Sequence, residues 1–198
     1  MAELLSQTNL VSHELSRPES RENNIDGTVN WYAAYTRFRC EKRVAEMLEY
    51  RRVDHYLPLY EAVHLWKHRK ARLQMPLFPS YVFVRLDLRD RRNILTVPGV
   101  IRLVGHPRPA PLSGREVEAI RDYLSHSLPV EPHPYLTTGR LVHIRTGPLA
   151  GLEGIILRRK SACRIVINLN PIRQAMVVEL PASDLEPICA LTSCPRTA

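Results

Sequence analysis

The sequence predicts an α+β protein with two domains, an N-terminal α/β sandwich and a small C-terminal five-stranded β-barrel. Over residues 30–127, segments with helical periodicity alternate with short apolar strands, as in helices packed on a sheet. Residues 128–134 then contain three prolines in seven positions and no apolar period, which is typical of a stiff extended linker. About five short strands follow within roughly fifty residues, a spacing that suits a small barrel.

Two segments of the N-terminal domain have clear helical patterns. In residues 39–51, apolar side chains such as Val44 and Leu48 recur on one face, and charged side chains occupy another. Residues 115–124 follow Ser113, whose hydroxyl is suited to cap a helix N-terminus. Residues 87–95 are expected to be short and helical or irregular.

Strands are expected between these helices. The strongest is 78–86, which is apolar enough for the centre of a sheet. Residues 61–66 and 71–75 are expected to pair as a hairpin with a basic tip at 67–70. The other predicted strands of this domain are 31–36, 54–58 and 100–104.

Glycines divide the strands of the C-terminal domain. Gly147, Gly151 and Gly154 stand where a small barrel turns its corners, because glycine tolerates positive φ and close backbone approach. The β-branched runs at 165–167 and 177–178 argue against helix and predict a stable barrel. The predicted strands are 141–145, 153–159, 163–168, 175–180 and 183–186.

These patterns divide the chain into a flexible polar leader at 1–28, an N-terminal domain at 29–127, a proline-rich linker at 128–138, the barrel at 139–188 and a disordered tail at 189–198. The leader lacks the basic and apolar regions of a signal peptide. No apolar run is long enough to span a bilayer. We therefore expect a cytoplasmic monomer that does not engage membranes.

The positive charge is concentrated in the two predicted domains. Residues 1–28 carry a net charge of −3, residues 29–131 of +7 and residues 132–198 of +4. A basic domain attracts polyanions at long range, and phosphate backbones are the commonest such partner. On charge alone, a basic surface that merely keeps the protein soluble is an equally good interpretation.

The sequence contains no pattern that predicts an enzyme. Its four cysteines form no CxxC pair and have no histidine partner at zinc spacing, so we expect reduced thiols and no metal. Its eight histidines are scattered, with no nucleophile motif or phosphate-binding loop nearby. We expect no catalytic residues and no cofactor.

Three motifs in order resemble the NusG family of transcription elongation and antitermination factors. Trp-Tyr-Ala-Ala-Tyr-Thr at 31–36, followed by a basic helix, resembles the opening of the NusG N-terminal domain. Pro-Leu-Phe-Pro-Ser-Tyr-Val-Phe-Val at 76–84 and Val-Pro-Gly-Val at 97–100 resemble its later signatures. The glycine-rich unit at 139–156 resembles a KOW motif. The second motif is most similar to that of the specialised RfaH- and UpxY-type paralogues, and the polar leader resembles that of the UpxY type.

The resemblance implies an antiparallel sheet with flanking helices and a surface for RNA polymerase. Phe78, Pro79, Tyr81 and Phe83 match the family positions that help form the pocket for the polymerase clamp helices. Alternation along a strand puts Tyr81 and Phe83 on one face. A purely structural role in the core is an equally good interpretation of Phe83, whereas Tyr81 suits a rim.

The resemblance also implies contact with the non-template DNA strand in the transcription bubble. Arg37, Arg39, Lys42 and Arg43 surround the start of the first predicted helix, and the last three are at i, i+3 and i+4. Phe38 is expected to anchor the helix start, although it could stack on a base. The alternative is a solvated helix face that Glu46 partly neutralises.

Two further basic segments have weaker implications. Residues 91–93 lie near the region that in RfaH-like proteins reaches the opposite pincer of polymerase, but the His-Thr-Thr run of RfaH is absent here. The hairpin tip at 67–70 is either a solvated turn, which we slightly prefer, or lies near upstream DNA.

The function implied is that of an elongation or antitermination factor, an operon-specific NusG paralogue that suppresses pausing or termination. Its KOW domain would recruit the ribosomal protein NusE or the terminator Rho. The alternative is a KOW-containing ribosomal or RNA-binding protein, against which the large N-terminal domain, the proline linker and the low lysine content argue.

Overall fold

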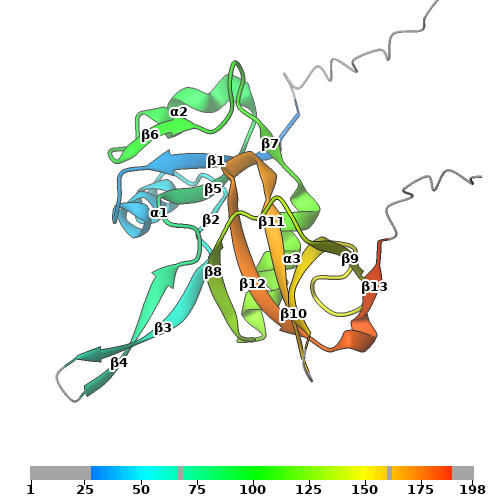
Figure 1. The fold of residues 1–198 in the computed structure, drawn as a ribbon. Helices are drawn as coiled ribbons and strands as arrows, with labels where there is room; N and C mark the ends of the chain where they lie inside the picture. The colour runs from blue at the N-terminus through cyan, green and yellow to red at the C-terminus, as the bar shows by residue number, and fades with distance from the viewer. Residues whose placement is uncertain (1–27, 67–68, 160–161, 189–198) are drawn as a thin grey trace, which may run out of the picture.

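The computed structural model describes residues 28–66, 69–159 and 162–188, so the leader and the tail lie outside the described residues. Its N-terminal part is an antiparallel sheet with helices on both sides, and its C-terminal part is a strand-rich barrel (Figure 1). The predicted fold class is therefore confirmed. The elements of the N-terminal part are β1 (Asn30–Thr36), α1 (Glu41–Tyr50), β2 (His55–Tyr56), β3 (Leu59–Trp66), β4 (Arg69–Pro76), β5 (Tyr81–Leu86), the 3-10 turn η1 (Leu88–Asp90), α2 (Arg91–Leu95), β6 (Val100–Leu103), β7 (Pro111–Leu112) and α3 (Gly114–Ser125).

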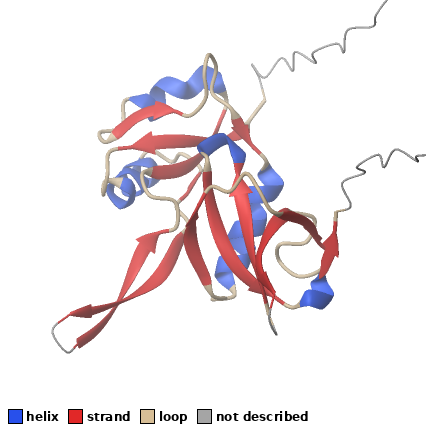
Figure 2. Ribbon diagram, viewed as in Figure 1, coloured by secondary structure: helices blue, strands red, loops and turns tan. Residues whose placement is uncertain are grey.

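The N-terminal sheet has the strand order β2-β5-β1-β6, with β7 also paired to β1. Tyr35 is opposite Tyr81 and Ala33 opposite Phe83, so these four residues share one face of the sheet. That face packs in a core with α3. The opposite face forms a second core with α1 and α2. The hairpin β3–β4 projects away from both layers (Figure 2).

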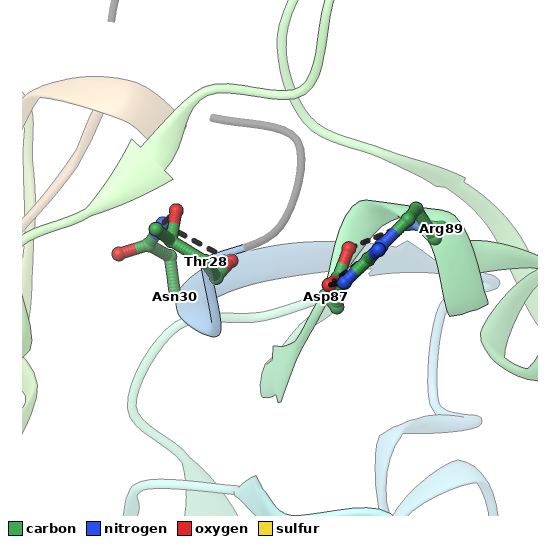
Figure 3. Close-up of polar contacts among 4 residues, drawn as sticks. All are labelled: Thr28, Asn30, Asp87 and Arg89. Atoms are coloured by element: carbon green, nitrogen blue, oxygen red, sulfur yellow. Dashed lines mark hydrogen bonds and ion pairs between the residues drawn. The ribbon is translucent and has the colours of Figure 1, made fainter. Parts of the chain in front are cut away.

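Side-chain caps fix the starts of two helical segments. The Ser113 hydroxyl accepts a hydrogen bond from the Glu116 amide at 3.4 Å, as the sequence predicts. Asp87 caps η1 by accepting from the Arg89 amide at 2.9 Å, and it also pairs with the Arg89 guanidinium at 2.6 Å (Figure 3). At the start of β1, the Asn30 side-chain amide donates to Oγ1 of Thr28 at 3.0 Å (Figure 3).

The first helix begins later than the sequence indicates. It starts at Glu41, with Cys40 at the N-cap position. Arg39 lies before the helix in a left-handed conformation, with φ of 61°. Arg39, Lys42 and Arg43 are consequently not three positions of one helical face, because only the last two are helical.

The C-terminal sheet has six strands in the order β13-β9-β10-β11-β12-β8. Five of them correspond to the five predicted strands, and β8 comes from the segment treated above as a linker. Pro132 and Pro134 are tolerated there because β8 is an edge strand, where a missing N–H leaves no neighbour unsatisfied. The elements are β8 (Val130–Pro134), β9 (Arg140–Ile144), β10 (Glu153–Arg159), β11 (Cys163–Leu169), η2 (Asn170–Ile172), β12 (Gln174–Leu180), η3 (Ala182–Asp184) and β13 (Leu185–Pro187).

Side chains fix β8 and the residues after it to the barrel. Glu131 of β8 is 2.7 Å from the Arg164 guanidinium on β11. The Asn168 side chain donates to the carbonyl of Leu136 at 2.6 Å and accepts from its amide at 3.3 Å. The Tyr135 hydroxyl donates to Oδ1 of Asn170 at 2.6 Å. This segment therefore belongs structurally to the barrel, and only residues 126–129 connect α3 to β8.

The barrel packs against α3, and the two parts share one apolar core (Figure 1). The Arg115 guanidinium of α3 is 3.5 Å from the carbonyl of Ala150 and packs on Gly151. The Tyr123 hydroxyl donates to the carbonyl of Pro129 at 2.9 Å, and burial raises the pKa of Tyr123 to about 12. α3 is therefore buried on two sides, by the N-terminal sheet and by the barrel.

Replacing Gly154 by alanine should destabilise the barrel, because the added Cβ would overlap Cγ2 of Ile165 and lie 3.1 Å from the carbonyl oxygen of Val166. We expect the free energy of unfolding, measured in urea, to fall by about 2–3 kcal/mol. Gly147→Ala is the control: it has φ of 84° but no neighbour within 4 Å, so it should cost only about 1 kcal/mol. Equal losses in the two variants would contradict the packing argument.

Candidate functional site

The turn at residues 36–41 is the point where the three sequence motifs meet. The Thr36 amide donates to the carbonyl of Ser80 at 2.8 Å, and the Arg37 amide donates to the carbonyl of Gly99 at 2.8 Å. The Ser80 amide in turn donates to Oε1 of Glu41 at 2.7 Å. Motifs that are far apart in the sequence therefore fix one turn between β1 and α1.

Gly99 is required at this junction. Its φ is 101°, a left-handed conformation that side chains disfavour. A Cβ at this position would lie 3.0 Å from Cγ2 of Val44 and 3.4 Å from Cβ of Cys40. A side chain here would thus push α1 away from the strand β6 that follows Gly99.

Glu41 is a buried carboxylate, 4% exposed, that joins α1 to the turn before β5. Glu41→Ala leaves the Ser80 amide without its acceptor, so we expect a loss of about 1–3 kcal/mol in the free energy of unfolding. Glu41→Gln keeps an acceptor and should lose less. Thermal and urea unfolding curves measure both, with the exposed Glu46→Ala as a control that should stay near the unmodified protein. A Glu46→Ala loss as large as that of Glu41→Ala would refute the role of the contact.

Exposed cations surround this fixed turn. The side chains of Arg37, Arg39, Lys42 and Arg43 are all exposed. None of the four has an ion pair with a carboxylate within the described ranges, whereas Arg85 and Arg121 elsewhere in this domain do. Their charge is therefore available to an anionic partner.

Phe38 does not anchor the start of α1. Its side chain is 68% exposed, between Arg37 and Arg39. The Arg39 guanidinium lies 5.2 Å from the centroid of the Phe38 ring, which is cation–π distance. The prediction of an anchoring role is wrong because the helix begins at Glu41, so Phe38 lies outside its apolar face.

A cluster of aromatic rings covers the α3-facing side of the sheet near the same turn. The ring centroids of Tyr35 and Tyr81 are 5.5 Å apart, those of Phe78 and Phe83 5.8 Å, and those of Tyr56 and Phe83 6.4 Å. Burial raises the pKa of Tyr56 to about 12 and raises that of Tyr81. The hydroxyls of Tyr56 and Tyr81 consequently stay neutral near pH 7.

The four residues predicted to bind polymerase differ in exposure. Phe83 is completely buried and Phe78 is 1% exposed, so both are core residues in this conformation. Tyr81 is half-buried and Pro79 is exposed. Tyr81 and Phe83 do share a face, as strand alternation requires. Of these four residues, only Tyr81 and Pro79 have accessible surface, and Tyr81 packs against the core cluster that contains both phenylalanines.

Tyr35 and Arg102 belong to this surface but were not among the predicted site residues. Tyr35 lies directly opposite Tyr81, and the Arg102 guanidinium lies 5.5 Å from the Tyr35 ring centroid. Arg121 of α3 similarly lies 4.7 Å from the Tyr56 ring centroid. The sequence signal is Tyr35 itself, the third aromatic residue of the 31–36 strand, but its partners depend on strand pairing that no local pattern specifies.

Two of the three KOW glycines, Gly147 and Gly151, occupy a turn of the barrel, whereas the prediction of a turn at Gly154 is wrong because Gly154 lies within β10, opposite Val142 of β9. Gly147 and Gly151 have φ of 84° and 85°, and they flank the turn between β9 and β10. The Gly151 amide donates to the carbonyl of Ile144 at 2.7 Å. Gly151 also lies under Arg115 of α3, so the KOW turn takes part in the contact between the two parts of the molecule.

The remaining basic segments are less informative. Residues 91–93 begin α2, where the Asn93 carbonyl accepts from Arg51 at 2.6 Å. Residues 67–68 of the hairpin tip lie outside the described residues. Among the residues that the structure describes, no group of three His, Cys, Asp or Glu side chains could hold a metal ion. No helix within those residues is long and apolar enough to cross a membrane.

Comparisons with known proteins agree on one family. The model of the family "Transcription termination factor nusG" matches residues 29–121. The transcription termination/antitermination protein NusG of Yersinia pestis is 28% identical over 174 residues, which are 79% of this chain and 94% of the relative. NusG of Escherichia coli (strain K12) is 29% identical over 139 residues, which are 66% of this chain and 75% of the relative.

A solved structure supports the fold. The structure "Domain interaction in Thermotoga maritima NusG" superimposes with a TM-score of 0.54 at 22% sequence identity, covering 81% of this chain and 98% of that chain. At this identity the likeness concerns the fold alone. The sequence matches show that the chain carries a NusG family domain at residues 29–121 and is similar over most of its length to NusG proteins.

Proposed function

We propose that this protein binds RNA polymerase through its N-terminal domain, contacts the non-template DNA strand, and suppresses pausing or termination. The observation that carries the proposal is the shared position of two surfaces. The exposed cations around residues 36–41 and the Tyr35–Tyr81 ring pair both border the turn that Ser80 and Glu41 fix. A protein built in this way could hold polymerase and an exposed strand at the same time.

The DNA contact is supported by charge and exposure. Arg37, Arg39, Lys42 and Arg43 are exposed, and no carboxylate in the described ranges pairs with them. Arginine suits a single strand because its guanidinium binds phosphate and also stacks on bases. The four cations would hold the strand where it passes the N-terminal end of α1.

The polymerase contact is supported by half-buried aromatic surface. Tyr81, Tyr35 and Pro79 offer apolar area with polar rims, and Arg102 adds a charged edge next to Tyr35. Aromatic and arginine side chains are the types that dominate binding energy at protein interfaces. The clamp helices of polymerase are the partner proposed for this surface.

The barrel is proposed to recruit a second partner, either the ribosomal protein NusE or Rho. We further propose an operon-specific role of the RfaH or UpxY type. The alternative function, a KOW-containing ribosomal or RNA-binding protein, differs in its partners. Affinity purification of the tagged protein distinguishes them: RNA polymerase should co-purify under the first proposal, whereas ribosomal subunits without polymerase would favour the second.

The activity itself can be measured with elongation complexes made from purified polymerase and a template with a known pause site. Adding the protein should shorten the pause and increase read-through. The variant Arg37→Glu/Arg39→Glu/Arg43→Glu should lose this effect. If the unmodified protein binds polymerase but leaves the pause as long as it is without the protein, the proposed activity is overturned.

A further inference from the structure

We propose that Phe38, which lies between the exposed cations Arg37 and Arg39, is a stacking platform for an unpaired base of single-stranded DNA. This inference rests on the proposed DNA contact and adds to it the residue that reads a base rather than the backbone. Phe38 has no role in the described core, and nothing else in the fold requires an aromatic side chain there.

The exposure of Phe38 is the first observation. With 68% of its side chain exposed, the ring leaves apolar area in water, which burial against a ligand would remove. Its two sequence neighbours, Arg37 and Arg39, are exposed cations. The ring can stack on one base while the cations on either side of it pair with the phosphates that flank this base.

The rigidity of the turn is the second observation. Thr36 and Arg37 are hydrogen-bonded through their amides to Ser80 and Gly99, and the Cys40 amide donates to the carbonyl of Arg37 at 3.0 Å. Phe38 therefore sits on a backbone that is fixed on both sides. Binding then requires little ordering of the protein, which favours affinity.

The left-handed Arg39 is the third observation. A non-glycine residue at φ of 61° is uncommon and is disfavoured in free energy. This conformation accompanies a turn in which the Arg39 guanidinium lies 5.2 Å from the Phe38 ring centroid. The arginine can thus contact a phosphate or the edge of a base that stacks on the ring.

The ligand chemistry follows from these features. Bases in a duplex already stack on both faces, so a protein ring can stack only on a base that is unpaired. Arg37, Lys42 and Arg43 supply phosphate contacts that any sequence can make. Stacking tolerates all four bases, so Phe38 alone confers a preference for single strands and not for a sequence.

The test uses the full chain and fluorescently labelled DNA oligonucleotides, single-stranded and duplex, in anisotropy titrations. Phe38→Ala should lower affinity for the single strand about 5- to 100-fold, which is the range for removing one stacked base. Phe38→Tyr should retain binding, and Phe38→Leu should lose it although it keeps apolar area. Duplex affinity and the salt dependence should be unchanged, because no phosphate contact is removed.

A second readout reports stacking directly. An oligonucleotide with 2-aminopurine should lose fluorescence on binding the unmodified protein and much less on binding Phe38→Ala. Tyr50→Ala is the matched control, because Tyr50 is 90% exposed at the other end of α1 and should not matter. All variants are surface changes, and urea unfolding confirms that they fold.

The outcomes separate this inference from the proposed function. If the charge-reversed arginine variant loses binding but Phe38→Ala and Phe38→Leu bind like the unmodified protein, only the stacking role is overturned. If Phe38→Ala weakens binding to polymerase and not to oligonucleotides, Phe38 belongs to a protein interface and the inference is wrong. If the unmodified protein binds no single strand, both proposals fall. If Phe38→Ala loses as much affinity for a single-stranded RNA oligonucleotide as for DNA, unpaired bases of either nucleic acid are the ligand and the restriction to DNA is overturned.

Discussion

Reversing Arg37, Arg39 and Arg43 to glutamate should lower affinity for single-stranded DNA at about 0.1 M salt by about 100-fold or more. Each phosphate contact on a single strand contributes about −0.7 to the slope of log affinity against log salt concentration. Three contacts therefore contribute a slope of about −2.1, which is about 100-fold in affinity at about 0.1 M salt relative to about 1 M. The unmodified protein, with four cations at the site, should show a slope of about −2.8. Anisotropy titrations over a series of salt concentrations measure both quantities.

The control for this variant is a second triple Arg→Glu variant, which changes the net charge by the same amount at positions outside the turn. Arg108, Arg140 and Arg145 are exposed and lie outside the turn at 36–41. Their simultaneous replacement by glutamate should reduce affinity only through the general loss of positive charge. Equal losses in the two triple variants would show that the cations around α1 are not a specific site.

Changing Tyr81 to aspartate should weaken binding to RNA polymerase core enzyme by about 30-fold or more, as expected for a central aromatic contact worth at least 2 kcal/mol. The change removes the ring that stacks near Tyr35 and places a negative charge on an apolar surface. Titration of labelled protein with polymerase, or competition for it, gives the affinity. Tyr81→Phe should bind nearly as well as the unmodified protein.

Tyr50→Asp is the matched control for Tyr81→Asp. Tyr50 is 90% exposed and lies at the end of α1, away from the ring cluster. Aspartate there should leave polymerase affinity unchanged. An unaltered affinity for Tyr81→Asp itself, with folding verified by circular dichroism, would remove Tyr81 from the interface.

The elements of this fold are largely predictable because each has a local signature. Ser113 caps α3 as a serine at that position predicts, and the alternation of Tyr81 and Phe83 places both on one face. The glycine-divided strands of the barrel also occur where the sequence indicates. Such features depend on residues within a few positions of one another, and this is the range over which periodicity and turn preference act.

The site was only partly predictable because its contacts are long-range. Glu41 and Ser80 are 39 positions apart, and nothing near Glu41 indicates that its carboxylate is buried. Phe38 was misassigned because a difference of two residues in the start of a helix decides whether a side chain packs or projects. The prolines of β8 predict a linker because they argue against a strand, although an edge position accepts them.

The short connection between α3 and β8 limits where the barrel can go. Because residues 130–136 are fixed to the barrel, a separation of the two parts would stretch only residues 126–129. Four residues span at most about 14 Å when fully extended. The barrel could therefore move only about this far from the end of α3, and a longer reach would require β8 to be released from β12.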